Sequence, residues 1–562
     1  MSTLGCMMRP FHVPRSTSHA RRPPLPIPFS LRTEAMAAPF PPSPPPRRFS
    51  PTPLRATPTP TPTITSACEV ISTVDGQLAL VTTRDCPGGT PLLEVPGDVC
   101  ITAVDAQSSI VGPLLQNRSD LVQLALWLLA EQAENENGKN NNTEKNNTDS
   151  PYKALLLASL RVPELSPLLW TPEERADLLR GSAVGVEAET RLASLRAEWA
   201  SIESDLAAAD PARAVFAPAT FHEEAFVRAF CTVVASSTYL EAAQCFALVP
   251  YVAGARRVSS SSSSSFSSSR AVGAACQVDY DLDTGHVILV SDRMIRAGKE
   301  VVLGGDERPN LELALALGSI PGDESEEKGE TTNQNQNQNQ NPYDYVEFPC
   351  QLLKTDTMYL PKKQIVEQFG FTDDMRFPVY PDRTPVQMLA YCRLARVQDP
   401  ADLAKISFEK DVVVSTMNEY EVLQILLGDC KERLNQYADS TIESDVKLLQ
   451  QLDRQLSSGS DLNDDLDLIL RKKKERLAAR LRLGEKRIVQ SFMDAVRRRL
   501  APIRGIPTKG GGMEDPNQDI LDMFNVIEAI PQAPQALLGG LARWARGEDD
   551  PEWKRKGGQK KK

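Results

Sequence analysis

Metal sites and disulfide frameworks require histidines or cysteines at particular spacings, and this 562-residue chain has few such residues. There are four histidines, and the ten cysteines occur singly, without any C-x-x-C pair. A zinc site needs a cluster of thiolate or imidazole ligands, and a disulfide framework needs closely spaced cysteines. The sequence therefore predicts neither. Of the histidines, only His222 and His286 lie outside the N-terminal segment.

The cysteines have the surroundings of core residues. Cys231, Cys245 and Cys392 each fall in an apolar stretch with helical periodicity. A free cysteine in such a place behaves as a small buried hydrophobe. We therefore expect no redox role for them.

The first 68 residues have the composition of an organelle transit peptide. They hold eight arginines, no lysine, one acidic residue (Glu34) and 17 of the 43 prolines. Arginine-rich segments with few acidic residues are typical of organelle import. The prolines between Pro23 and Pro28 interrupt the only stretch that could form the apolar part of a secretory signal. Because they also hinder the amphipathic helix of a mitochondrial presequence, we expect import into the plastid stroma.

Charge and hydropathy limit the partners of the remaining chain. Residues 69–562 hold 55 basic and 73 acidic residues, a formal charge of −18, which gives no general attraction for nucleic acid. Nucleic acid could bind to three basic stretches, Arg471–Lys474, Arg497–Arg499 and the tail Lys554–Lys562. We favour the simpler interpretation of these stretches as a solvated helix face and a disordered tail. The nearest candidate for a membrane span, Leu121–Ala130, has about half of the residues that one needs. We expect no membrane span.

Turn signals and apolar periodicity predict strands on either side of a helical block. The expected strands are Leu78–Thr82, Pro91–Ile101, Cys276–Leu282, His286–Val290 and Glu300–Leu303. The pattern from Leu121 to Phe246 is helical, and Thr171-Pro172-Glu173-Glu174 has the residues of a capping box. From Thr384 to Leu500 apolar residues recur every three or four positions, as they do in helices.

Three low-complexity stretches lack the residues to build a core. They are the Asn-rich residues 135–149, the serine run 259–269, and residues 323–341, which end in Asn-Gln repeats. Polar tracts of this kind bury too little apolar surface to offset the entropy of ordering. We interpret all three as disordered insertions.

Several short strings occur in order along the chain. They are Leu92–Pro96, Leu169–Glu174, Asn310–Leu315, Asn418–Glu419, Leu434–Tyr437, Glu443–Asp445 and Arg482–Lys486. Together with the order of strands and helices, they resemble the SET-domain family of the plastid Rubisco large-subunit lysine methyltransferase type. The resemblance covers most of residues 69–505.

The resemblance implies an α+β fold, in which SET-type small β-sheets with an inserted helical block are followed by an all-α C-terminal domain. The expected organisation is a transit peptide at 1–68, a SET-type domain at 69–320, a disordered linker at 321–345, an all-helical substrate-binding domain at 346–508, and an extension with a basic tail at 509–562.

The resemblance also implies a chemistry, protein-lysine N-methylation with S-adenosylmethionine as the methyl donor. Such an enzyme must desolvate a lysine amine, whose ordinary pKa is about 10.4, and aim its neutral form at the methyl group. A glycine-rich turn that meets the cofactor would correspond to residues 75–79, so the candidate cofactor-binding residues are Gly76, Gln77, Leu78 and Ala79. Only one glycine stands there, and an ordinary turn before a strand explains it equally well.

Other positions of the family pattern lack the expected side chains. The arginine beside the cofactor falls on Ser237, within Ser236–Tyr239. Loss of one charge-assisted hydrogen bond costs on the order of 1.5 to 3 kcal/mol. The Asn-His pair that follows a Val-Pro is absent from Tyr251–Arg257, which follows Val249-Pro250.

The two tyrosines that would orient the amine are missing as well. The first falls on Gly304 or Gly305, and the second falls on Leu317, ahead of Gly318. We therefore assign no catalytic residue, and the sequence predicts a degenerate catalytic centre.

Two functions are consistent with this pattern. The favoured one is a non-catalytic module that keeps the peptide groove and the helical domain, binds a plastid protein or peptide, and needs no cofactor. The alternative is an active S-adenosylmethionine-dependent lysine methyltransferase that acts on a plastid protein.

Overall fold

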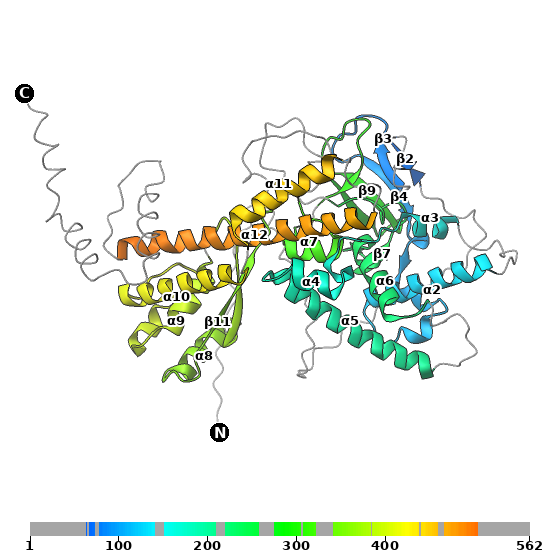
Figure 1. Ribbon diagram of the computed structural model, residues 1–562. Helices are drawn as coiled ribbons and strands as arrows, with labels where there is room; N and C mark the ends of the chain where they lie inside the picture. The colour runs from blue at the N-terminus through cyan, green and yellow to red at the C-terminus, as the bar shows by residue number, and fades with distance from the viewer. Residues whose placement is uncertain are drawn as a thin grey trace, which may run out of the picture. The chain divides into compact units, whose positions relative to one another are not determined.

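A computed structural model provides the three-dimensional structure (Figure 1). It describes residues 63–64, 67–72, 78–140, 151–208, 220–257, 275–304, 307–321, 341–383, 385–437, 440–458 and 466–503. We call the described residues up to 321 the N-terminal lobe, and residues 341–503 the C-terminal lobe. The serine run, most of the two Asn-rich stretches, most of the expected transit peptide and the C-terminal extension lie outside the described residues.

The strands of the N-terminal lobe form three small sheets, as expected. One sheet has the order β1-β4-β9-β8-β10, the second pairs β2 with β3, and the third has the order β5-β7-β6. The strands are β1 (Thr63–Ile64), β2 (Cys68–Ser72), β3 (Leu78–Thr82), β4 (Pro91–Pro96), β5 (Ile101–Thr102), β6 (Thr238–Leu240), β7 (Cys245–Leu248), β8 (Ala275–Asp281), β9 (His286–Ser291) and β10 (Val302–Leu303).

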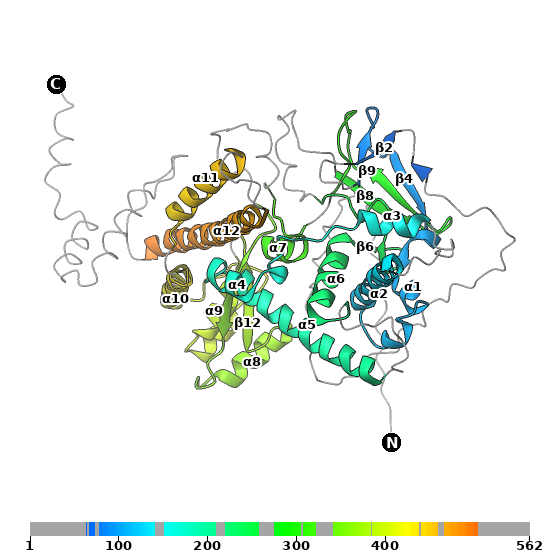
Figure 2. The ribbon, with the colours of Figure 1, turned by 45° about the vertical axis from the view of Figure 1, so that its right-hand side comes forward.

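Among the described residues, six α-helices are inserted between β5 and β6, and one more follows β10. They are α1 (Ala103–Gln107), α2 (Asp120–Asn140), α3 (Pro151–Ser159), α4 (Pro172–Leu178), α5 (Ala183–Ala208), α6 (Glu223–Ser236) and α7 (Asn310–Leu317). The capping box expected at the start of α4 is confirmed: Thr171 accepts from the backbone of Glu174, whose carboxylate accepts from the backbone of Thr171. Helices α2 and α6 pack against each other (Figure 2).

The C-terminal lobe is mainly helical, and a two-stranded antiparallel ribbon lies near its beginning. Its elements are β11 (Val346–Gln351), α8 (Tyr359–Gln368), β12 (Asp374–Val379), α9 (Val386–Ala395), α10 (Thr416–Asn435), α11 (Ile442–Ser458) and α12 (Leu466–Ile503). Helix α12 packs against both α10 and α11 (Figure 1). The helical pattern predicted from Thr384 onward is confirmed, and the ribbon adds strands to a region expected to be entirely helical.

Helix α12 belongs to two apolar cores. Its 38 residues make it about 57 Å long at 1.5 Å per residue. Leu477, Ala478 and Leu481 pack into the core built by the inserted helices of the N-terminal lobe. Ile488, Phe492 and other residues in its second half pack into the core of the C-terminal lobe. The two lobes therefore share one helix.

Several expected boundaries were wrong. The helical block ends at Ser236, because Thr238–Leu240 and Cys245–Leu248 form a hairpin that pairs with β5. The expected strand Pro91–Ile101 is broken after Pro96 by a 3-10 helix, and the strand expected at Glu300–Leu303 covers only Val302–Leu303. Isolated short strands carry too little alternation to be found from sequence.

Two regions expected to be disordered contain ordered residues. Helix α2 continues to Asn140, six residues into the Asn-rich stretch. Asn341, the last residue of the third stretch, is buried, and its amide donates to the backbone oxygen of Arg308 at 2.8 Å. At the N-terminus, Thr63 pairs with Glu94 in the sheet, so ordered structure begins before residue 69.

Candidate functional site

The turn expected to meet a cofactor continues directly into a strand. Gly76 and Gln77 lie outside the described residues, whereas Leu78 and Ala79 are the first residues of β3. They pair with Ser72 and Ile71 of β2 in an antiparallel ladder, and Ala79 is buried. In the described part of this turn, the backbone is therefore paired with β2 in the sheet.

The end of α6 holds a cation that sequence comparison did not identify. Ser237 stands where the family arginine is expected, and its backbone amide donates to Val233 at the helix terminus. Arg257 Nη2 donates to the backbone oxygen of Ser237 at 2.6 Å and lies 3.4 Å from Thr238 Oγ1. A cation is favourable at a helix C-terminus, where carbonyl groups are exposed. Arg257 thus caps α6 from a different segment of the chain.

The segment that should carry the Asn-His pair is a tightly packed apolar turn. Val249, Val252 and Ala253 are each at most 3% exposed. A Cβ atom on Gly254 would lie 2.5 Å from the backbone oxygen of Ser159, so the close approach to α3 requires glycine. Apolar side chains here can neither accept a proton nor orient an amine.

Tyr251 is the one titratable residue among residues 249–255, and it adopts a strained backbone conformation with φ of 66°. Burial raises the pKa of its phenol above the ordinary value, and the neighbouring Tyr152 adds to the rise. A raised pKa keeps the phenol neutral at physiological pH. Tyr251 can therefore donate a hydrogen bond but is a poor base.

The turn then joins the C-terminal part of the sheet. Arg256 forms an ion pair with Glu300 at 2.8 Å, and its backbone oxygen accepts from the amide of Leu303 at 2.7 Å. This pairing brings residues 256–257 beside β10.

The expected tyrosine positions provide no hydroxyl group. The amide of Gly304 donates to the backbone oxygen of Cys276 at 2.9 Å, and Gly305 lies outside the described residues. Leu317, the last residue of α7, packs against the core of the inserted helices. Gly318 caps that helix with φ of 68°, and a Cβ atom there would lie 2.7 Å from the Ser166 amide.

The described residues at these positions do not fit the methyltransfer site of the family. Ser237, Gly304 and Leu317 carry no charge, and the turn after Pro250 is apolar up to Ala255 except for Tyr251. The nearby cation, Arg257, is engaged with the end of α6. The structure brings the predicted positions into one lobe, where Ser237 and the Tyr251 phenol offer hydrogen-bonding groups.

The strings in the C-terminal lobe that carry the resemblance form buried polar contacts. Glu419 accepts two hydrogen bonds from Arg393, at 2.6 and 2.8 Å, and both side chains are nearly inaccessible. The side-chain amide of Asn418 donates to the backbone oxygen of Arg393 at 3.0 Å. This bidentate pair joins α9 to α10, so these residues have a structural role.

A second buried cluster connects the lobes. Glu485 of α12 accepts from the Ser182 hydroxyl at 2.8 Å, from the Ala183 amide at 3.1 Å, and from the phenol of Tyr437. Burial raises the pKa of Glu485 despite these donors. Nearby, Lys486 forms an ion pair of 2.6 Å with Asp445, and each side chain is 2% exposed.

The basic residues of α12 are partly engaged within the protein. Lys474 forms an ion pair of 2.7 Å with Glu174 of the N-terminal lobe, and Arg499 forms one of 2.6 Å with Asp411. The described residues contain no group of three or more metal-binding side chains. Within the same ranges, no helix is long and apolar enough to cross a membrane.

The small sheets, the inserted helices and the helical lobe follow one another in the order that the sequence resemblance predicted. Residues 353–489 match the family model described as Rubisco LSMT substrate-binding. The chain is also 24% identical over 428 residues to the chloroplastic [fructose-bisphosphate aldolase]-lysine N-methyltransferase of Arabidopsis thaliana, a match that covers 74% of this chain and 76% of that protein. The resemblance inferred from the sequence is thereby confirmed.

Solved structures have the same fold. The SET domain of LSMT bound to lysine and AdoHcy aligns with a TM-score of 0.56 at 19% identity, over 82% of this chain and 94% of that one. Rubisco LSMT bound to AdoMet aligns with a TM-score of 0.54 at 19% identity, over 82% and 95%. At this level of identity the likeness establishes the fold alone.

Proposed function

We propose that this protein is a non-catalytic member of the SET-type proteins, a module that binds a plastid protein or peptide through a retained scaffold. The observation that carries the proposal is the apolar, close-packed turn from Val249 to Ala255 in place of a polar pair. Charge and hydrogen-bonding capacity are needed to hold a cofactor and orient an amine, and the turn offers only the Tyr251 phenol.

The state of the C-terminal lobe supports binding as the retained activity. Its buried cations Arg393 and Lys486 have carboxylate partners, and large apolar side chains remain exposed on it. Met417 of α10 is 68% exposed, and Val413, just before that helix, is 52% exposed. Exposed apolar groups near one another are a common feature of protein-binding surfaces.

Plastid localisation is part of the proposal. It rests on the composition of the first 68 residues and on the chloroplastic protein from Arabidopsis to which the chain is similar. Import of a fluorescent fusion of residues 1–68 into isolated chloroplasts, with shortening of the fusion, tests it. A fusion that stays outside the organelle would contradict it.

The alternative function, S-adenosylmethionine-dependent methylation of a protein lysine, has one observation in its favour. Arg257 brings a guanidinium to the helix end where the family arginine is expected. If this group bound the carboxylate of the cofactor, the charge lost at Ser237 would be restored from another segment.

Calorimetric titration of S-adenosylmethionine separates the two functions. The protein should start at Thr57, which removes most of the expected transit peptide and keeps β1 in the sheet. We expect no saturable heat from a sample that circular dichroism shows to be folded. Saturable binding, followed by transfer of labelled methyl groups to a stromal protein, would overturn the proposal.

Two arginine variants make that titration more informative. Arg257→Ala removes the group at the helix end, whereas Arg256→Ala removes the neighbouring arginine that pairs with Glu300. If the cofactor binds to wild type, a loss of affinity of about tenfold in Arg257→Ala alone would support the alternative. Equal heats of binding in all three proteins, or no heat in any of them, would not support the alternative.

Retention of a stromal protein on immobilised wild-type protein tests the binding function. Met417→Glu should abolish retention, because it places a charge on the exposed apolar surface of α10. Met294→Glu is the matched control, since Met294 is 61% exposed in the N-terminal lobe. Retention that is equal for both variants would show that this face of α10 is not the binding surface.

A further inference from the structure

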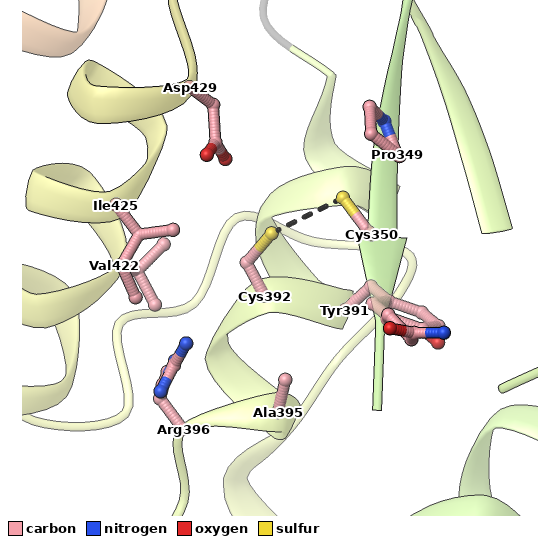
Figure 3. A pocket seen from close by; sticks show the side chains of 10 residues that line it. Pro349, Cys350, Tyr391, Cys392, Ala395, Arg396, Val422, Ile425 and Asp429 are labelled. Carbon is pink, nitrogen blue, oxygen red and sulfur yellow. Dashed lines mark hydrogen bonds between the residues drawn. The ribbon is translucent and has the colours of Figure 1, made fainter. Parts of the chain in front are cut away.

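Two cysteines that are distant in sequence face each other in the C-terminal lobe. Cys350 lies on β11 and Cys392 on α9, and their Sγ atoms are 3.6 Å apart (Figure 3). Cys350 points inward because β11 alternates buried and exposed residues. No redox role was expected for Cys392 from the sequence, because 42 positions separate it from Cys350.

Both thiols are held in place by neighbouring contacts. On α9, the Tyr391 phenol donates to the backbone oxygen of Thr372 at 3.0 Å, and Arg393 is fixed by its two bonds to Glu419. On β11, Cys350 pairs with Met375 of β12 in the antiparallel ribbon. Contacts of the residues that flank Cys392 fix its position on α9, and the antiparallel ribbon fixes the position of Cys350. The two thiols therefore face each other in the folded lobe.

A small pocket gives access to the pair. It has a volume of about 110 Å³ and lies between β11, α9 and α10, with both cysteines in its wall. Figure 3 shows the two sulfur atoms turned toward each other, with Arg396 and Asp429 nearby. A cavity of this size admits a molecule as small as hydrogen peroxide. Cys392 is half-buried, whereas Cys350 is 9% exposed.

We propose that Cys350 and Cys392 are a redox modification site, at which a small peroxide converts the two thiols into a reversible disulfide. A disulfide has an S–S distance of about 2.05 Å, so the two sulfur atoms must approach by roughly 1.5 Å. Side-chain rotation can supply that movement. The inference is independent of whether the protein binds S-adenosylmethionine.

The more exposed thiol reacts first. The hydrogen bond to Cys392, and after it burial, raise the pKa of Cys350 well above its ordinary value, which disfavours it as the attacking thiolate. The Cys392 thiolate attacks one peroxide oxygen, the O–O bond breaks, and the departing hydroxide takes up a proton to form water. Cys392 is then a sulfenic acid.

The second step closes the crosslink. Cys350 loses its proton and attacks the sulfenic sulfur, the S–O bond breaks, and the hydroxide leaves as a second water. In total, two thiols lose two electrons and two protons, and one peroxide becomes two waters. A soluble dithiol reverses the change by thiol–disulfide exchange.

The crosslink would tie β11 to α9 across 41 intervening residues. Closing a loop of that length restricts the unfolded chain, so we expect the Tm of the oxidised protein to rise by roughly 5–10 °C. It would also change the wall of the pocket between β11, α9 and α10.

Peptide mapping of the full-length protein tests the site. After treatment with a small excess of hydrogen peroxide, trypsin should release residues 329–354 and 384–393 as one linked species, about 2 Da lighter than the sum of the two peptides. Each peptide contains a single cysteine, Cys350 or Cys392, which makes the assignment unique. Dithiothreitol should separate the two peptides and reverse the rise in Tm.

Serine variants provide the controls. Cys392→Ser should lose the linked species and the rise in Tm, whereas Cys245→Ser should keep both, because Cys245 is a half-buried cysteine in the other lobe. Oxidation of Cys392 to sulfinic or sulfonic acid without a linked peptide in wild type would overturn the proposal. A link between a different pair of cysteines would do the same, and neither result depends on the variants folding.

Discussion

The turn after β7 and the helices of the C-terminal lobe handle polar groups in opposite ways. The turn holds buried Val249, Val252 and Ala253 where a polar pair is expected. The C-terminal lobe, in contrast, buries complete ion pairs such as Arg393 with Glu419 and Lys486 with Asp445. The C-terminal lobe thus buries charged side chains in pairs, whereas the described turn after β7 buries apolar ones.

The sequence strings that carry the family resemblance belong to contacts that stabilise the fold. The strings Asn418–Glu419, Leu434–Tyr437, Glu443–Asp445 and Arg482–Lys486 all contribute to buried contacts that join helices or lobes. Residues of this kind are required by the fold whether or not a reaction takes place. A chain can therefore keep a family's strings and fold without its chemistry.

The largest effect should come from breaking the buried pair of Lys486 and Asp445. Asp445→Ala leaves a buried ammonium group without its partner, which should lower the free energy of unfolding by about 3–5 kcal/mol in denaturant titration. Asp402→Ala removes the partner of the exposed Lys405 and should cost much less, because solvent screens an exposed pair. Similar costs for both variants would show that burial adds nothing to the contact.

Asp344, just before β11, should make stability depend on pH. Burial raises the pKa of Asp344 to about 7, although Asn310 donates to it from its backbone and side chain. The folded state thus keeps a proton that the unfolded state releases, so the free energy of unfolding should fall as pH rises from about 4 to 7. At roughly 1.4 kcal/mol per pH unit, the fall would reach about 4 kcal/mol and level off above pH 7.

Asp344→Asn tests that origin, because the amide is neutral throughout. Its free energy of unfolding should change less between pH 4 and 7 than that of wild type. Asp382→Asn, at a well-exposed carboxyl, should follow the wild-type profile. If Asp344→Asn also follows wild type, the buried carboxyl is not the source of the dependence.

A glycine pair should separate contact between the lobes from backbone strain. Gly181 and Gly370 both have φ of 77°, but a Cβ atom on Gly181 would lie 2.4 Å from the backbone oxygen of Gln436, whereas Gly370 faces open space. Gly370→Ala should cost about 1–2 kcal/mol from strain alone. Gly181→Ala should cost roughly 2 kcal/mol more, measured by chemical unfolding. Equal losses in the free energy of unfolding would mean that the backbone around Gln436 moves to accept the added Cβ atom without cost.

The smallest effect should come from Arg257. Arg257→Ala removes the bond to the backbone of Ser237 and should lower the free energy of unfolding by about 1–2 kcal/mol. Under the proposed function it leaves the response to S-adenosylmethionine unchanged, because neither protein binds it. If wild type binds S-adenosylmethionine and this variant does not, the N-terminal lobe would have a cofactor-binding cation, contrary to the proposed function.

Local patterns were sufficient to predict several elements from the sequence. The capping box at Thr171 and the hairpin on either side of Asp283-Thr284-Gly285 depend on residues that are adjacent in the chain. Strands β6 and β7 were missed, because three or four residues hold little periodicity and their pairing partner β5 lies far away in sequence. Their stability comes from tertiary contact.

The same limit applies to the candidate sites. The prediction that family side chains are missing at Ser237 and Leu317 needs only alignment along the chain. The proximity of Arg257 to Ser237, and of Cys350 to Cys392, depends on folding of distant segments. The adjacent arginines at 256 and 257 were the only local signal for the first, and no local signal marked the second.

Helix α12 determines when this chain can finish folding. Leu477, Ala478 and Leu481 complete the core of the N-terminal lobe, although they lie far beyond α7 in the sequence. A chain that emerges from a ribosome or an import channel starting at its N-terminus leaves that core open until these residues arrive. Until then an apolar surface of the N-terminal lobe stays uncovered, and exposed surface of this kind favours aggregation.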